Sequence, residues 1–367
     1  MNNFVQKRSQ QIVKIMNSIN ETKLQELVAQ MLQDLGAAVN SPLVLIGDKL
    51  GLYKAIATHG QLESTELARV TNTNERYLRE WLAAQAASGY IKYDSQTEQF
   101  YMSPEQIAIF ADEDSSNYMI GGFYSLSSIF SNEPKLSEAF RTGEGIGWGE
   151  HTECLFCGTA KFFRPTYKTY LTSEWLPSLE GAIAKLTKGA KVADIGCGHG
   201  CSTAIMAEAF PNSEFFGFDF HPSSIAAARE LATEKRLDNL NFEVSTAKNY
   251  PGHNYDLVAF FDCLHDMGDP VGAVTHAKET LNSDGTLLIV EPFAGDRLEH
   301  NLNQIGRLMY GFSTTVCTPS SLSQEVGLAL GAQAGEKRLG EVVKSGGFSR
   351  FRRASETPFN LILEARI

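Results

Sequence analysis

The stretch VADIGCGHG, at residues 192–200, is the part of the chain that says most about its chemistry. It contains Asp194, Gly196, Cys197, Gly198 and Gly200 between an apolar run and a helical pattern. Glycines at such a turn let a ligand approach the backbone closely. The dinucleotide fingerprint G-x-G-x-x-G needs Gly or Ala at position 201, where this chain has Cys201. Because Asp194 would repel a pyrophosphate, the pattern instead favours a cationic ligand.

A second acidic residue ends the next apolar run, EFFGFDF, at Asp219. A carboxylate at this place can accept hydrogen bonds from both ribose hydroxyls of an adenosine. The neighbouring Phe220 is suited to pack on the adenine face. A nucleoside that carries a cationic, amine-bearing group and no phosphate describes S-adenosylmethionine, which we therefore predict as the cofactor.

A third cluster lies in FFDCLHD, which contains Phe261, Asp262 and His265. Methyl transfer to a hydroxyl aligns acceptor, methyl and sulfur, and also needs a base with a pKa near neutrality. Ligands of open α/β sheets bind at the carboxyl edge, where this cluster should lie. Glu291 ends the following strand and is placed to hold the His265 ring. In the alternative interpretation His265 only stabilises its loop and Glu291 is a structural acid.

The elements that position these residues alternate between strand and helix after residue 185. Strands are expected at AKVADIG, EFFGFDF, LNFEVSTA, YDLVAFFD and GTLLIVEP, with amphipathic helices between them. This alternation predicts an open, mostly parallel sheet of the doubly wound α/β class. GFSRFRRA and PFNLILEARI predict two further strands, which form an antiparallel hairpin at the C-terminal edge of a seven-stranded sheet.

The N-terminal part has a different order of predicted elements, in which helices are followed by a helix–turn–helix and a hairpin. Ser64 and Asn74 are candidate helix caps, and IKYD with QFYM predicts the hairpin of a winged helix. Residues 1–100 carry ten Lys and Arg against ten Asp and Glu, so no basic face is left to read DNA. We interpret this domain as structural or dimerising. The glycine-rich segment GEGIGWGEH, at 143–151, is interpreted as a flexible connector rather than a pocket edge.

Together these motifs resemble the class I S-adenosylmethionine-dependent methyltransferases, with DIGCGHG as the first motif and FDF as the acidic second one. Over roughly residues 35–367 the chain is similar to a bacterial small-molecule branch with an N-terminal winged helix. The motifs that carry this likeness are FRPTY (163–167), FFDCLHDMGDP (260–270), VEPFAGDRLEHN (290–301), TPSSLSQEVGLALGAQAGE (318–336) and RFRRASETPFNLILEAR (350–366).

The resemblance implies a homodimer through the N-terminal domain. The chain is also similar to plant-type O-methyltransferases, which place a catalytic His after strand four and an acid that supports it after strand five. This resemblance implies that His265 is the catalytic His and that Glu291 is the supporting acid. Many relatives carry an Asp after strand three that contacts adenine. Here that segment is Ser-Thr-Ala-Lys at 245–248, which leaves the contact to Thr246 or the backbone.

The sequence thus predicts a cofactor site and two catalytic residues, His265 and Glu291. The predicted cofactor-binding residues are Tyr167, Asp194, Gly196, Cys197, Gly198, Gly200, Asp219, Phe220, Thr246, Ala247, Phe261 and Asp262. No metal site is predicted, since the acids near His265 do not match the set of the magnesium-dependent enzymes. The predicted domains are N-terminal helices (1–35), a winged helix (36–105), a helical linker (106–165) and the catalytic domain (166–367).

Composition sets the remaining limits. A net charge of −11, 43% hydrophobic residues and six cysteines are typical of a globular protein of the cytoplasm, without membrane or nucleic-acid partners. We predict O-methylation of a small-molecule acceptor. The alternatives are a ligand-sensing transcriptional regulator, an N-methyltransferase without a general base, and a nicotinamide-dependent oxidoreductase, which Cys201 disfavours.

Overall fold

The computed structural model describes residues 19–367, and the helix expected before residue 19 lies outside this range. The chain forms two compact units, which meet in sequence between Ile107 and Ala108. No helix in the described range has the length and apolar character needed to cross a lipid bilayer.

The N-terminal unit is a winged helix preceded by a long helix. Its elements are α2 (Glu21–Lys49), α3 (Leu52–His59), α4 (Ser64–Thr71), α5 (Glu75–Ala87), β1 (Lys92–Asp94) and β2 (Gln99–Tyr101), and α6 (Pro104–Phe110) crosses the junction between the units. Asn74 caps α5 as predicted, accepting from the N–H groups of Arg76 and Tyr77. Ser64 is not a cap: it is the first residue of α4, and its hydroxyl donates to Glu75 at 2.5 Å.

Helix α2 also runs through the predicted domain boundary at residues 35 and 36. Gly36 does not end the helix, because one interior glycine costs only about 1 kcal/mol, less than a long cooperative helix gains.

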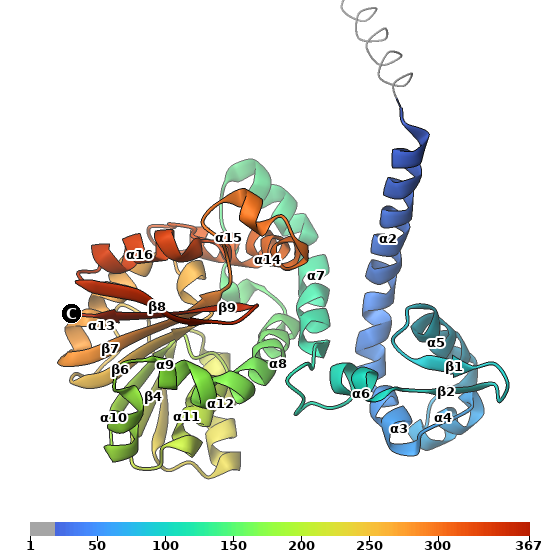
Figure 1. Ribbon diagram of the computed structural model, residues 1–367, viewed down its shortest axis with the longest axis horizontal. Helices are drawn as coiled ribbons and strands as arrows, with labels where there is room; N and C mark the ends of the chain where they lie inside the picture. Colours follow the sequence, from blue (N-terminus) through green and yellow to red (C-terminus); the bar gives the residue numbers. More distant parts are fainter. Residues whose placement is uncertain (1–18) are drawn as a thin grey trace, which may run out of the picture. The chain divides into compact units, whose positions relative to one another are not determined.

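The C-terminal unit contains the predicted seven-stranded sheet, with strand order β5-β4-β3-β6-β7-β9-β8. The strands are β3 (Lys191–Ile195), β4 (Glu214–Asp219), β5 (Leu240–Val244), β6 (Tyr255–Phe261), β7 (Leu281–Pro292), β8 (Arg350–Glu356) and β9 (Asn360–Arg366). The first five are parallel, and β8 and β9 form the antiparallel edge (Figure 1). The predicted α/β class, with its N-terminal winged helix, is confirmed.

Helices cover both faces of this sheet. They are α7 (Ile120–Thr142), η1 (Trp148–Glu150), α8 (Glu153–Tyr170), η2 (Leu171–Trp175), α9 (Leu176–Ser178), α10 (Ala182–Lys188), α11 (Cys201–Ala209), α12 (Pro222–Lys235), η3 (Leu264–Asp266), α13 (Pro270–Thr280), η4 (Leu298–Asn301), α14 (Gln304–Phe312), η5 (Ser313–Cys317), α15 (Thr318–Leu322) and α16 (Gly335–Ser345). Helix α8 passes through the predicted boundary at residues 165 and 166, so the last part of the predicted linker is continuous with the catalytic domain.

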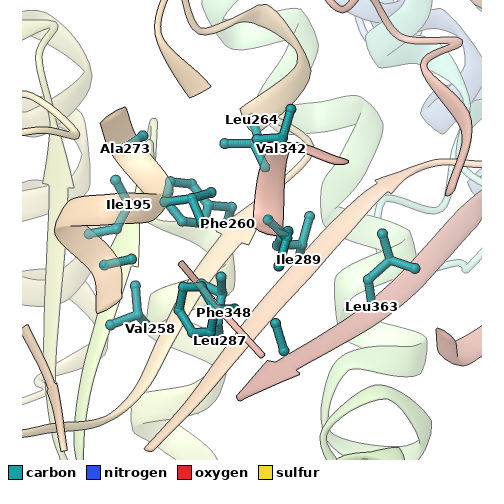
Figure 2. Close-up of a cluster of buried hydrophobic side chains, with 14 of the residues drawn as sticks. Ile195, Val258, Phe260, Leu264, Ala273, Leu287, Ile289, Val342, Phe348 and Leu363 are labelled. Atoms are coloured by element: carbon teal, nitrogen blue, oxygen red, sulfur yellow. The ribbon is translucent and has the colours of Figure 1, made fainter. Parts of the chain in front are cut away.

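Two apolar cores lie on opposite faces of the sheet because side chains alternate along each strand. On β3, Ala193 and Ile195 belong to the core shared with α13 and α16, part of which Figure 2 shows. Val192 faces the other core, which is shared with η2, α10 and α11. This two-sided burial explains why the parallel strands are continuous apolar runs.

The segment at 143–151 is not an open connector, contrary to our interpretation of its glycines. The backbone N–H of Ile146 donates to Pro319 O at 2.9 Å, and the Ile146 side chain is buried. Trp148, in η1, lines the main cavity of the unit. The segment is therefore a pocket edge, packed against α15.

Candidate active site

A cavity of about 480 Å³ opens at the carboxyl edge of the parallel strands. Ten of the twelve predicted cofactor-binding residues line it: Tyr167, Gly196, Cys197, Gly198, Asp219, Phe220, Thr246, Ala247, Phe261 and Asp262. Asp194 and Gly200 lie behind the lining. The predicted catalytic residues, His265 and Glu291, also lie outside it.

The turn after β3 explains how its glycines serve different purposes. Gly198 lines the cavity with φ +54°, and a Cβ placed on it would meet no atom within 4 Å. Gly200 has φ +74°, and its Cβ would lie 2.3 Å from Cζ of Phe242. Gly198 therefore keeps the cavity open, whereas Gly200 allows the turn to pack on β5.

Asp194 holds this turn from below. It is 1% exposed, and its Oδ2 accepts hydrogen bonds from the hydroxyls of Ser202 at 2.6 Å and Thr203 at 2.7 Å. Its Oδ1 is buried and has no partner among the described residues. Burial raises the pKa of Asp194 to about 6.

Asp219, at the end of β4, faces the turn. Its two carboxylate oxygens accept from the backbone N–H groups of Gly198 at 3.0 Å and His221 at 2.8 Å. Burial nevertheless raises the pKa of this carboxyl above its usual value. The acid is thus oriented toward the cavity before any ligand is present.

A set of hydrogen-bonded polar side chains lies at the cavity where β6 ends. Tyr167 donates its hydroxyl hydrogen to Oδ2 of Asp262 at 2.8 Å, and Asn360 donates to Oδ1 at 3.1 Å. Asp262 has φ +50°, a strained conformation for a residue with a side chain. Burial raises its pKa to about 7. Asn360 was missed by the sequence analysis, since it comes from β9, at the far end of the chain.

The structure brings His265 and Glu291 together. Nδ1 of His265 forms a short contact with Glu291 Oε2, and the His265 backbone N–H donates to Oε1 at 3.2 Å. Both side chains are almost fully buried, at 4% and 1% exposed. The second ring nitrogen, Nε2, lies 3.3 Å from Sγ of Cys317, a residue that the sequence analysis did not consider.

Other cavity residues were also missed. Trp148, Phe156 and Phe163 supply an aromatic wall from η1 and α8. Lys248 bridges Asp269 at 3.1 Å and Glu325 at 2.8 Å on the opposite rim. Several of them lie in segments quoted above, but no local pattern marks them as cavity residues, because only the fold brings these segments together.

Asp266 lines the cavity, and burial raises its pKa to about 7. Across residues 19–367, no group of three or more His, Cys, Asp or Glu side chains is arranged to hold a metal ion.

Two family models match parts of the chain. Residues 186–346 match a family described as a methyltransferase domain, and residues 38–111 match a Rv2258c-like winged HTH domain. The chain therefore contains a methyltransferase domain preceded by a winged helix, and the class predicted from the sequence motifs is confirmed.

Individual proteins show the same likeness. Aklanonic acid methyltransferase DauC from Streptomyces sp. (strain C5) is 31% identical over 113 residues, which are 30% of this chain and 51% of the relative. The chain spans about half or less of the length of the curated relatives that it matches.

Solved structures match the fold over nearly the whole chain. A putative O-methyltransferase from Nostoc punctiforme aligns with a TM-score of 0.69 at 21% identity, covering 92% of this chain and 98% of that one. Human N-acetylserotonin methyltransferase in complex with SAM aligns with a TM-score of 0.65 at 15% identity, covering 92% and 97%. At 21% and 15% identity, these two alignments show a likeness of fold.

Proposed function

We propose that the chain is an S-adenosylmethionine-dependent methyltransferase that acts on a small organic acceptor. The observation that carries this proposal is the hydrogen bond between Asp219 and the open Gly198 turn, which both line the cavity. A carboxylate at the end of β4 suits ribose hydroxyls, and Gly198 leaves room for the ligand beside the backbone.

The charges around the cavity fit this cofactor. Asp219, Asp262 and Asp266 line it, and Lys248, the sole Lys or Arg in its described lining, is already paired with Asp269 and Glu325. Asp194 adds a buried carboxylate oxygen without a partner in the described chain. Such a site suits a ligand with positive charge and disfavours a pyrophosphate.

We assign the cofactor to the predicted residues that line the cavity, with Asp194 and Gly200 as supports of the turn. When bound, S-adenosylmethionine supplies a methyl group on a positively charged sulfur. Tyr167 and Asp262 are placed to orient the amino-acid end, and Phe220 to pack against the adenine. Thr246, which also accepts from Asn249 at 3.2 Å, lies at the place of the missing adenine contact.

For the transfer itself we infer O-methylation with His265 as the general base. Glu291 fixes the ring through Nδ1, which leaves Nε2 as the nitrogen able to take a hydroxyl proton. The printed names of the relatives, which include an aklanonic acid methyltransferase and an N-acetylserotonin methyltransferase, support a small organic acceptor.

We further infer a homodimer formed through α2. Seven apolar side chains on this helix are exposed at spacings of one to four residues: Leu24, Leu27, Val28, Met31, Leu32, Leu35 and Val39. They form one stripe along the helix, and a second copy of the same helix is a complementary partner for such a stripe. All six cysteines are free thiols, which supports a place in the reducing cytoplasm.

Calorimetric titration with S-adenosylhomocysteine tests the cofactor site. We expect micromolar binding that weakens at least 100-fold in Asp219→Ala, while Glu214→Ala, an exposed acid at the start of the same strand, binds like the wild type. Absence of binding by the folded wild-type protein would reject the proposal and favour the ligand-sensing regulator.

An acceptor screen that pairs each hydroxyl compound with its amine analogue then tests the chemistry. Loss of hydroxyl methylation in His265→Gln is expected. Activity restricted to the amines, and unchanged in that variant, would instead identify an N-methyltransferase without a general base.

A further inference from the structure

The contact between His265 and Cys317 has no role in the function proposed above. Cys317 ends η5, a single π-helical turn between α14 and α15, and is 7% exposed. Its Sγ lies 3.3 Å from His265 Nε2, the ring nitrogen that a hydroxyl acceptor would need. The thiol is therefore the partner of the ring nitrogen that the proposed function assigns to the acceptor hydroxyl.

The protonation of His265 follows from the groups that face it. These are Glu291 on β7, Cys317 on η5, and the carboxyl groups of Asp262 and Asp266, which interact electrostatically with the ring. Burial opposes a charged ring, but the Glu291 carboxylate and the Cys317 thiol outweigh it and raise the pKa of His265 well above its ordinary value. While the imidazole carries both protons it donates through both nitrogens, so Nε2 then donates to Cys317 and is not able to accept a proton.

The cavity lies next to this contact. Asp266 and Met267 line it next to His265, and Ser320 lines it one helical turn after Cys317. His265 and Cys317 themselves do not. An acceptor hydroxyl that bonds to Nε2 has to take the place of the Cys317 thiol, because the thiol is the partner of that nitrogen.

We propose that Cys317 is a positioning residue for His265, whose thiol holds Nε2 in the resting enzyme and is displaced by the hydroxyl of the acceptor. The inference rests on the proposed use of His265 as the base. The π-helical turn η5 is the segment that moves, because such turns are rare, are strained relative to an α-helix, and recur at functional sites.

Displacement of the thiol activates the base. Without Cys317 as its partner, His265 has a lower pKa and releases its Nε2 proton to water. The acceptor oxygen then bonds to the methyl carbon while its own proton moves to Nε2. The carbon–sulfur bond breaks, and its electron pair remains on the sulfur. The base is thus freed only when an acceptor is in place.

The test is a pH titration of the full-length protein with ¹³C-labelled histidine, followed by NMR between pH 5.5 and 10. His265→Gln assigns the signal. Cys317→Ala should lower the midpoint of His265 by at least one pH unit, and Cys317→Ser, which keeps a hydrogen-bonding group, by less than half as much. Cys157→Ala, an exposed thiol on α8, is the matched control and should shift nothing.

An unchanged His265 midpoint in both Cys317 variants would overturn the proposal, as would an equal shift in the Cys157 control. If Cys317→Ala does not fold, the serine variant alone decides, since a shift of its midpoint is still required. The titration does not depend on methyl transfer. A failure of the proposed function would instead appear as absent binding of S-adenosylhomocysteine by the wild type.

With an acceptor from the screen, the same variants give a kinetic readout. Cys317→Ala should lower the acceptor KM several-fold and move the acidic limb of the kcat profile to lower pH. An unchanged KM and an unmoved limb would contradict displacement.

Discussion

The carboxylate of Asp219 accepts a hydrogen bond from the backbone N–H of Gly198 at 3.0 Å, which ties the end of β4 to the turn after β3. The two strands are neighbours in the sheet, so their carboxyl ends bring the acid and the glycine turn together. The site is therefore preorganised, and a ligand that binds in the cavity beside them meets an acid already in position.

This turn allows two substitutions of the same type to be distinguished. Gly198→Ala places a methyl group in the open cavity, so we expect a folded protein that binds S-adenosylhomocysteine at least tenfold more weakly. Gly200→Ala places its methyl group against Phe242, and we expect a loss of about 2–3 kcal/mol in the free energy of unfolding. Calorimetry and thermal unfolding measure both; wild-type affinity in Gly198→Ala would contradict the open-turn assignment.

The cavity acids predict how stability depends on pH. Asp266 keeps its proton up to about pH 7 in the folded protein but loses it near the ordinary value of 3.8 when unfolded. Its contribution is thus fully present below about pH 4 and is lost as the pH rises through 7.

Asp266→Asn imitates the protonated form. We expect it to stabilise the protein by about 1–2 kcal/mol at pH 8, a modest gain because partial exposure to the cavity screens the charge of Asp266. At pH 4 the gain should be much smaller, because Asp266 is then already protonated in the folded protein. Thermal unfolding across this range is the measurement, with the exposed Asp238→Asn as control. A gain that is equal at both pH values would exclude the buried-acid explanation.

The apolar stripe on α2 predicts the assembly. Light scattering on the wild type should give twice the chain mass of 40.3 kDa. Leu32→Lys combined with Leu35→Lys should give the monomer mass, because two charges would be buried against the partner. Gln33→Lys, on the opposite face of the helix, is the control. A monomeric wild type would rule out the α2 interface.

The winged helix should not bind DNA. On α5, Arg76 pairs with Glu80 at 2.7 Å and Arg79 with Glu75 at 2.6 Å, which leaves these arginines without spare charge for phosphates. We expect no electrophoretic shift on random DNA at low salt. A shift that weakens steeply with added salt would support the alternative function, a ligand-sensing transcriptional regulator.

The sequence alone was sufficient for the fold and for ten of the residues that line the cavity. Apolar runs of five to seven residues that alternate with amphipathic helices specify a doubly wound sheet because burial on both faces is a local property of each strand. The turn at Gly198 and the acid at Asp219 each follow directly from one strand. Their meeting at the carboxyl edge follows from the sheet class alone.

Only the tertiary structure placed the residues whose partners are distant in the chain. Asn360 reaches Asp262 because β9 pairs with β7, and Trp148 enters the cavity wall because its segment packs on α15. Both residues lie in segments that the sequence analysis singled out, but their partners could not be predicted, since chain crossings rather than local patterns create these contacts.

His265 shows the same difference between what the sequence indicates and what only the tertiary structure determines. Its residue type and its place after β6 made it a candidate base, and the pairing with Glu291 follows from two adjacent parallel strands. That its free nitrogen meets Cys317, fifty-two positions later, depends on how the helix from α14 to α15 folds back over the sheet edge. A local pattern can indicate which side chain is able to move a proton, whereas packing decides what that side chain touches.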